Sequence, residues 1–496
     1  MMQIPLYPSG IRLNLAYALL GISATESILV FALCLPLIRN EIPMGTGFLS
    51  FTVASSSLAH CSTVVPFGNL ADKVGRRKIF IVGLIFGIVG GLIGVFASDP
   101  LQLLTSRLIV GIGEGMLMGV GLAILTTLQH PSKLPIAVSR WTVFITLSNI
   151  FALYVTSSLL SISWRISMLY TPVLWALILV VSPILLRESK VKSKEDNLLA
   201  NLLLGGSFVS TLYSLTRLEA DGFNFAFLSF LLIGLLLLLA WYRLQKSSKN
   251  PNFPVEILTN KTYLGGVIAS FSFSFMYKSM NVQLPSFLEA QEHLKGAMVG
   301  IIQMPSYIAG MISCIVIGYF ISRKYLTRRM TVTIGFIVMS LGFLLLGQLA
   351  KTFNPVAVVV STVILTIGVY FTALPSFDII AETAPKSFLG SVTGSHAVFA
   401  QLGGSLGLII SSSSIVLANS QNPEGRWLMN APNYMNIAVN HLIIAVRQFA
   451  GQKHITSKNI YYFTADAFHS YSILFATISL FFMITFLFIY KPLLKE

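Results

Sequence analysis

Four ionisable side chains lie inside long apolar stretches of this sequence, where their chemistry could serve proton exchange or the binding of a charged solute. They are Glu26, Arg107, Glu114 and Lys278. A charge at the centre of a bilayer costs on the order of 2.5 to 3.5 kcal/mol, so each is expected to face protein or water rather than lipid. Burial favours a neutral carboxyl group and a nearby cation favours an ionised one. A glutamate beside an arginine could therefore change its protonation whenever its access to water changes.

The sequence predicts a proton-coupling set made of Glu26, Arg107 and Glu114, with Glu26 as the main proton carrier. Lys278 lies near the middle of its own apolar stretch and could oppose Glu26 across a cavity between two halves of the chain. A purely structural role, as ion pairs that hold helices together, remains the alternative for these residues. His60, His396 and His469 are interpreted as polar packing groups.

Residues close to Lys278 are the candidates for a substrate cavity. The predicted lining is Lys278, Phe275, Tyr277 and Asn281, in a stretch rich in aromatic residues. An aromatic wall suits an amphipathic ligand, although aromatic side chains that face lipid are the commoner interpretation.

The composition indicates the elements that must position these groups. The 496 residues are 55% hydrophobic and only 10% charged, and the mean hydropathy is +0.79, which is far too apolar for a soluble globular protein. A membrane-spanning helix needs roughly 20 apolar residues. The sequence predicts fourteen such helices: 13–37, 48–67, 79–98, 101–127, 141–161, 166–186, 198–216, 224–242, 263–287, 297–322, 330–350, 355–380, 389–417 and 467–490.

The polar segments divide and orient this chain. We expect a six-helix bundle in 1–187, a linker with two additional helices in 188–262, and a second six-helix bundle in 263–496 that includes an outer loop, 418–466. That loop contains a stretch with the pattern of an amphipathic helix at the membrane surface. About two thirds of the 33 Lys and Arg residues lie in loops on one side, which predicts that both termini are cytoplasmic.

The loop GNLADKVGRRK, whose glycine, acidic and basic residues stand at characteristic spacings, joins the second and third predicted helices. Its residues Gly68, Asp72, Gly75, Arg76 and Arg77 are the candidate conformational gate. Glycines permit a tight turn between helices, and Asp72 is free to meet an arginine or a helix N-terminus. The alternative is a basic loop that only sets membrane orientation. A second copy, GYFISRKYLTRR, has Ser322 in place of the acid, so we expect it to lack the charge contact of the first.

These motifs carry a family resemblance. The loop GNLADKVGRRK and the passage LLTSRLIVGIGEG, an arginine followed by a glycine ladder, resemble the two N-terminal motifs of the major facilitator superfamily. The passages SWRISMLYTP, NPNFPVEILTN and LGSVTGSHAVFAQLGGSLG are similar to its fourteen-helix drug:proton antiporter branch. The resemblance implies an all-α major facilitator fold, two six-helix bundles plus two additional helices, with Arg107 facing the central cavity.

Two departures from that branch concern the coupling mechanism. The predicted helix 141–161 contains neither glycine nor proline, where the branch carries a glycine-rich antiporter motif that ends in Gly-Pro. Glu26 also lies one position away from the register of the family's acidic residue, and Ser27 takes the aligned place.

The resemblance implies a proton-coupled exporter of drugs or other amphipathic molecules in the inner (plasma) membrane, acting as a monomer on a small-molecule substrate. Carriage of one endogenous metabolite, such as a carboxylate or siderophore, is a second interpretation, because Arg107 and Lys278 balance the two glutamates. A membrane-embedded enzyme or sensor is a third, but the sequence has no nucleotide or metalloprotease motif. Three cysteines without metal-like spacing predict no metal site, and we expect no catalytic residue, cofactor or nucleic-acid partner.

Overall fold

The computed structural model describes residues 10–24, 27–44, 46–128, 134–160, 162–189, 197–221, 224–248, 251–289, 297–350, 354–385, 388–421 and 457–492. Glu26 lies outside these residues. The amphipathic helix expected within the outer loop also lies outside them.

The described residues form helices and contain no strand. The first group comprises α1 (Ile11–Ser23), α2 (Ser27–Glu41), α3 (Thr46–Val74), α4 (Arg76–Val95), α5 (Pro100–Leu128), α6 (Leu134–Leu159), α7 (Trp164–Met168) and α8 (Tyr170–Leu185). Next come α9 (Leu198–Asp221), α10 (Phe225–Ser247) and the short 3₁₀ helix η2 (Val255–Thr259). The last group comprises α11 (Lys261–Glu289), α12 (Ala297–Ser322), α13 (Arg328–Ala350), α14 (Pro355–Thr383), α15 (Leu389–Gln421) and α18 (Ser457–Ile489).

The helices have the length and composition that a bilayer requires. Within the described residues, 9 of them are long and apolar enough to cross a membrane. Each of the fourteen predicted ranges contains helix, but the count of fourteen spans stays a prediction. The physical reason for helices is that lipid offers no hydrogen bonds, so every backbone group must find its partner within the helix.

Two of the predicted spans are broken in the structure. The first predicted span consists of α1 and α2, which are separate helices. The sixth consists of α7 and α8, with Ser163 capping α7 by accepting a hydrogen bond from the backbone N–H of Arg165. Pro172 stands in the first turn of α8 and has no N–H to donate to the preceding turn, which accounts for the second break.

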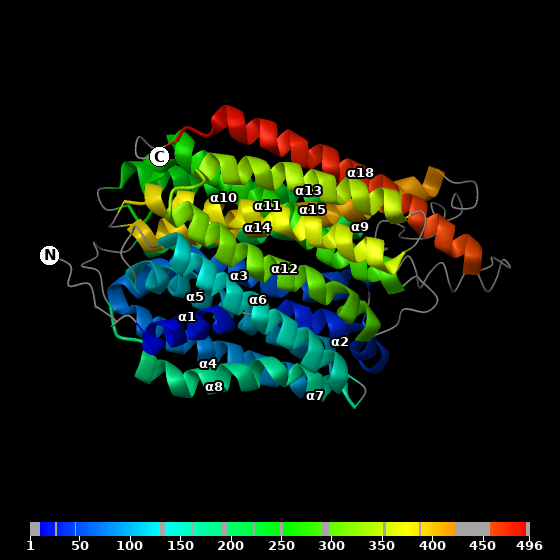
Figure 1. Ribbon diagram of the computed structural model, residues 1–496. Helices are drawn as coiled ribbons and strands as arrows, with labels where there is room; N and C mark the ends of the chain where they lie inside the picture. The colour runs from blue at the N-terminus through cyan, green and yellow to red at the C-terminus, as the bar shows by residue number, and fades with distance from the viewer. Residues whose placement is uncertain are drawn as a thin grey trace.

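The helices lie side by side in one bundle (Figure 1). In it, α9 packs against α3 and α15, whereas α6 packs against α12 and α14. The core of the last group is rich in aromatic residues such as Phe343 and Phe475. A further core joins the two groups, because Trp141 of α6, Cys314 of α12 and Phe377 of α14 belong to one buried cluster.

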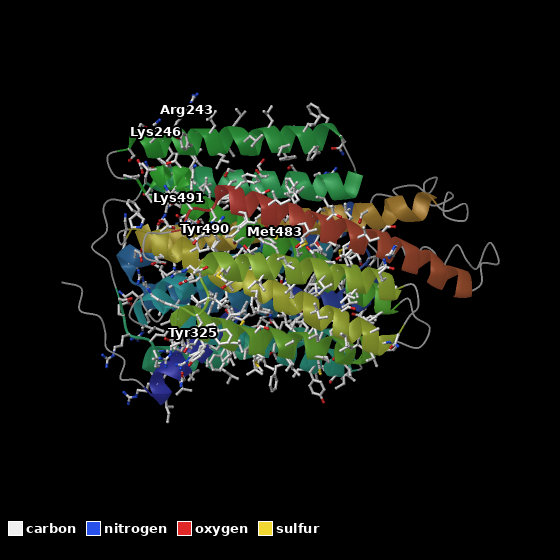
Figure 2. All side chains as sticks on the ribbon, turned by 45° about the horizontal axis from the view of Figure 1, so that its top comes forward. Arg243, Lys246, Tyr325, Met483, Tyr490 and Lys491 are labelled. Carbon is white, nitrogen blue, oxygen red and sulfur yellow. The ribbon has the colours of Figure 1, made fainter. Side chains whose placement is uncertain are left out.

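One end of the bundle carries the basic loops. The helix α1 begins and α18 ends there (Figure 1), and Figure 2 shows Arg243, Lys246 and Lys491 at the same end. The turn between α3 and α4 also lies at this end. We call it the motif end.

Candidate functional site

The break between α1 and α2 places a helix N-terminus against a buried carboxylate. The backbone N–H of Ser27, the first residue of α2, donates a hydrogen bond of 2.6 Å to Oε1 of Glu114 on α5. The first amides of a helix have no partner inside it and carry partial positive charge, so they favour a nearby anion. Broken helices whose N-termini face anions are a known way to build binding sites inside membranes.

Arg107 joins three helices at this point. Its Nη1 donates to Oγ of Ser27 on α2 at 3.0 Å, and its Nη2 donates to Oγ of Ser56 on α3. The guanidinium also lies 4.5 Å from the ring centroid of Phe31. Arg107 is only 2% exposed, and its Nε has no hydrogen-bond partner among the described residues.

His60 completes the cluster, and its role was not anticipated from the sequence. Its Nδ1 lies 3.9 Å from Oε2 of Glu114, and Glu114 is 7% exposed. The sequence predicted that His60 is a packing group, since nothing in a single sequence pairs a residue of α3 with one of α5. We call Arg107, Glu114, His60, Ser27 and Ser56 the buried polar cluster.

The glycine ladder of α5 explains how these residues approach one another. A Cβ atom on Gly111 would lie 2.3 Å from the carbonyl oxygen of Ser56, and one on Gly115 would lie 2.6 Å from that of His60. Small residues let two membrane helices pack backbone to backbone. Gly113 lies on the opposite face of α5 and allows α4 to pack closely there. A Cβ atom on Gly113 would lie 2.7 Å from the carbonyl oxygen of Gly83 on α4.

The predicted substrate residues lie on α11, in the last group of helices. Nζ of Lys278 donates to Oε1 of Gln401 on α15. The ring of Tyr277 lies 6.3 Å from that of Tyr370 on α14, whose hydroxyl is 3.0 Å from Oγ1 of Thr146 on α6. Tyr277 therefore lies close to a polar contact between the two groups of helices.

Two other predicted lining residues have different surroundings. Phe275 is 3% exposed, and its ring stacks on that of Phe475 at 5.2 Å inside the aromatic core. Asn281 is partly buried on the same helix.

The candidate gate forms a compact contact at the motif end. Nη2 of Arg76 lies 2.8 Å from Oδ1 of Asp72, and Nη1 of Arg76 donates to the carbonyl oxygen of Ala123 on α5 at 3.1 Å. Burial raises the pKa of the Asp72 carboxyl, although Arg76 acts in the opposite direction. The contact ties the turn between α3 and α4 to the end of α5.

The tight turn itself is made by Gly75 alone. Its φ of 126° is a conformation that favours glycine, and a Cβ there would lie 2.6 Å from the carboxyl group of Glu188. That carboxyl group accepts a hydrogen bond of 3.2 Å from the backbone N–H of Arg77. Gly68 instead lies buried within α3 and takes no part in the turn.

The second loop also has a charge contact, contrary to expectation. Arg328, at the start of α13, forms an ion pair with Asp378 and another with Glu382 at 2.7 Å, both on α14. Asp378 is 2% exposed. The expectation was wrong because it rested on Ser322, which replaces the acid inside the loop motif. The acids that pair with Arg328 come instead from the neighbouring helix α14.

A bundle of long apolar helices around buried ionisable groups is typical of a polytopic membrane protein. The sequence profile described as Major Facilitator Superfamily matches residues 15–408. The chain therefore belongs to the Major Facilitator Superfamily, which makes it a transporter rather than an enzyme.

Known proteins of this type are similar in sequence or in fold. The Quinolone resistance protein NorB of Staphylococcus aureus (strain Newman) is 22% identical over 397 residues, which cover 78% of this chain and 84% of NorB. The human organic anion transporter MFSD10 (TETRAN) superposes with a TM-score of 0.62 at 12% identity, over 97% of this chain and 100% of that one. The proton:xylose symporter XylE, bound to 6-bromo-6-deoxy-D-glucose, superposes with a TM-score of 0.60 at 13% identity. The superposition covers 92% of this chain and 98% of XylE.

Proposed function

We propose that this chain is a proton-coupled exporter of drugs or other amphipathic small molecules that works by alternating access. The observation that carries the proposal is the buried polar cluster, in which Glu114 lies within reach of a helix N-terminus and of His60. The similarity to a quinolone resistance protein supports a drug as the substrate. In this proposal Glu26, Arg107 and Glu114 form the proton-coupling set.

The cluster has the chemistry that coupling needs. A carboxylate next to a cation and helix amides is stable when ionised, and the same carboxylate accepts a proton when water reaches it from an acidic side. A proton that moves inward through about 100 mV releases about 2.3 kcal/mol, which can bias a transport cycle. The imidazole of His60 is 14% exposed and lies beside Glu114. Glu26 directly precedes Ser27, whose N–H binds Glu114.

The proposed orientation places the motif end in the cytoplasm of a cell whose inner membrane holds the protein as a monomer. The concentration of Lys and Arg in the loops at that end supports it. Two contacts between the groups of helices lie towards the same end. The rings of Trp141 and Phe377 are 6.4 Å apart, and a Cβ on Gly394 would lie 3.3 Å from Val64. These contacts support a state that is closed on the cytoplasmic side.

Uptake of a quinolone into inverted membrane vesicles, with and without an imposed proton gradient, tests the proposal. We expect gradient-driven uptake that Glu26→Gln and Glu114→Gln each abolish while expression is preserved. Glu256→Gln changes an exposed acid on η2 in the same way and serves as the matched control. Unchanged uptake in both the Glu26 and the Glu114 variant would reject the proton assignment.

The second candidate is carriage of one endogenous carboxylate or siderophore. Lys278 favours it, because a partly buried cation on α11 that already donates to an amide oxygen can also receive an anion. A labelled carboxylate such as citrate, assayed in the same vesicles, separates the candidates. Gradient-dependent citrate flux that Lys278→Gln removes, with no quinolone flux, would favour the metabolite carrier.

A further inference from the structure

The two lateral seams between the first and last groups of helices differ in what covers them. At one seam α3 packs against α15, and α9 packs on both of them. Asn201 of α9 accepts a hydrogen bond of 3.4 Å from Asn69 of α3, which ties the covering helix to this seam. At the other seam α6 packs against α12, and among the described residues its outer surface is apolar and open. Phe151, Ile312 and Ile315 are each more than half exposed there. A face of this kind is in contact with lipid.

A crevice of about 420 Å³ opens at the uncovered seam, between α1, α6 and α12. One part of its lining is polar, from Asn14, Ser139 and Arg140, and the rest is mainly apolar, including Val143, Phe144 and Ile315. This division matches a molecule with a polar head and a hydrocarbon tail.

The polar part of the crevice is cationic. Arg140 is exposed, and its Nη1 donates to Oδ1 of Asn14 at 3.1 Å, which fixes the direction of the guanidinium. A guanidinium has five N–H donors, so others remain for a second acceptor. A further cation stands at the rim, because the guanidinium of Arg323 lies 5.5 Å from the ring centroid of Tyr319, a lining residue. The eight residues that line the crevice include no Asp or Glu.

The depth of the crevice suits a lipid headgroup. Asn14 lies in the first turn of α1, Arg140 near the start of α6 and Tyr319 near the end of α12. All three positions belong to the motif end of their helices, where Arg243 and Lys246 also lie (Figure 2). Cations at this level attract anionic lipids, and the apolar lining extends from them along α6.

We propose that this crevice binds one anionic phospholipid from the leaflet at the motif end, with its phosphate on Arg140 and an acyl chain along Val143 and Ile315. Because its lining comes from both groups of helices, the lipid bridges the seam. A lipid held there stabilises the closed arrangement of the motif end, since separation of α6 from α12 would divide its binding site.

Retention of lipid by the purified protein tests this inference independently of transport. The protein is incubated in mixed micelles of phosphatidylglycerol and phosphatidylcholine, washed, and examined by native mass spectrometry. We expect one tightly retained phosphatidylglycerol, and Arg140→Gln should weaken its binding roughly five-fold, as expected for loss of one cation near anionic lipid. Arg243→Gln removes an exposed cation at the same end but far from the crevice, and it should retain the lipid.

A second variant separates the headgroup from the tail. Ile315→Trp fills the crevice from its exposed side and keeps all cations, so we expect it to lose the lipid as well. Equal retention of phosphatidylglycerol by Arg140→Gln and the unsubstituted protein would overturn the inference, as would equal retention of phosphatidylcholine. Displacement of the lipid by inorganic phosphate at millimolar concentration would show that the site takes a free anion and would also overturn it. Displacement by a quinolone would show a substrate site instead of a lipid site.

Discussion

At the scale of single residues, the buried polar cluster shows how a membrane protein tolerates ionisable groups. Arg107 donates to hydroxyl groups on two helices, while Glu114 accepts from the amide of Ser27 and lies near His60. Each charge therefore has polar partners that replace water. A planar fork of donors is what allows one side chain to reach Ser27 and Ser56 together.

Arg107→Lys tests this geometry. A lysine keeps the charge but has a compact ammonium group that cannot span both hydroxyls. We expect transport to fall at least about ten-fold, in keeping with the loss of one hydrogen bond to a charged group. Vesicle uptake measures the effect, and a thermal melt of the purified variant shows whether it is folded. Full activity in the lysine variant would mean that charge alone is sufficient.

At the scale of elements, contacts at the ends of helices hold neighbouring helices together. The turn at Gly75 and the pair formed by Asp72 and Arg76 fix α3, α4 and α5 to one another at the motif end. In the last group, Arg328 performs the comparable function with two acids of α14. The same type of contact thus occurs in both groups, with different partners.

Asp72→Asn addresses the gate. Asparagine keeps an acceptor for Arg76 but removes the charge, which should weaken the closed state by about 1 to 3 kcal/mol. We expect slower transport with normal substrate binding. Initial rates and equilibrium binding of a quinolone distinguish the two, and Asp99→Asn, at a partly buried acid just before α5, is the control. Lost binding in a folded protein would contradict a gating role.

The opposite end of the bundle offers a pH-dependent contact. Glu41, at the end of α2, forms an ion pair with Arg165 of α7. Nη1 of Arg165 donates a hydrogen bond to the Glu41 carboxylate, and this bond lowers the pKa of the Glu41 carboxyl. A carboxyl whose pKa is lowered in the folded state stabilises the protein above its unfolded pKa, and that contribution is lost as the pH falls through the lowered value. Glu41→Gln should melt at a slightly lower temperature at pH 7, and the difference should vanish under more acidic conditions. A difference that grows with acidity would contradict the assignment.

At the scale of the whole molecule, the two groups of helices share a core at the motif end. Trp141 is 6% exposed and packs towards Phe377, and Cys314 is fully buried in the same cluster. This core must open if the proposed cycle exposes the motif end to the cytoplasm.

Trp141→Ala should favour that opening. Removing a buried tryptophan costs about 3 to 5 kcal/mol, and much of the loss falls on the contact between the groups. We expect faster maleimide labelling of Cys314 in a background that lacks Cys34 and Cys61. Phe343→Ala, inside the core of the last group alone, is the matched control. Unchanged labelling of Cys314 in the folded Trp141 variant would show that this contact does not hold the end closed.

Much of the fold was predictable from the sequence because its causes are local. Hydropathy predicts membrane helices wherever backbone groups cannot bond to water, and the loop with Asp72 and Gly75 marks the turn by its own residue types. The breaks after α1 and α7 were missed, because each lies inside a stretch whose length and mean hydropathy suit one continuous membrane helix. Arg107 and Glu114 were identified as site residues because they are ionisable groups inside an apolar stretch, and Ser27 stood in the register of the family's acidic residue.

The amino-acid sequence by itself determined that the chain is a helical membrane protein of the Major Facilitator Superfamily and that Arg107 and Glu114 are buried ions. Only the tertiary structure decided their partners: the Ser27 amide, 87 residues from Glu114 in the chain, His60 on α3, and the acids of α14 that pair with Arg328. Hydropathy along one helix does not specify which other helix will pack against it. That choice depends on close packing across the bundle, as at Gly111 and Gly115, where the absence of side chains allows two backbones to meet.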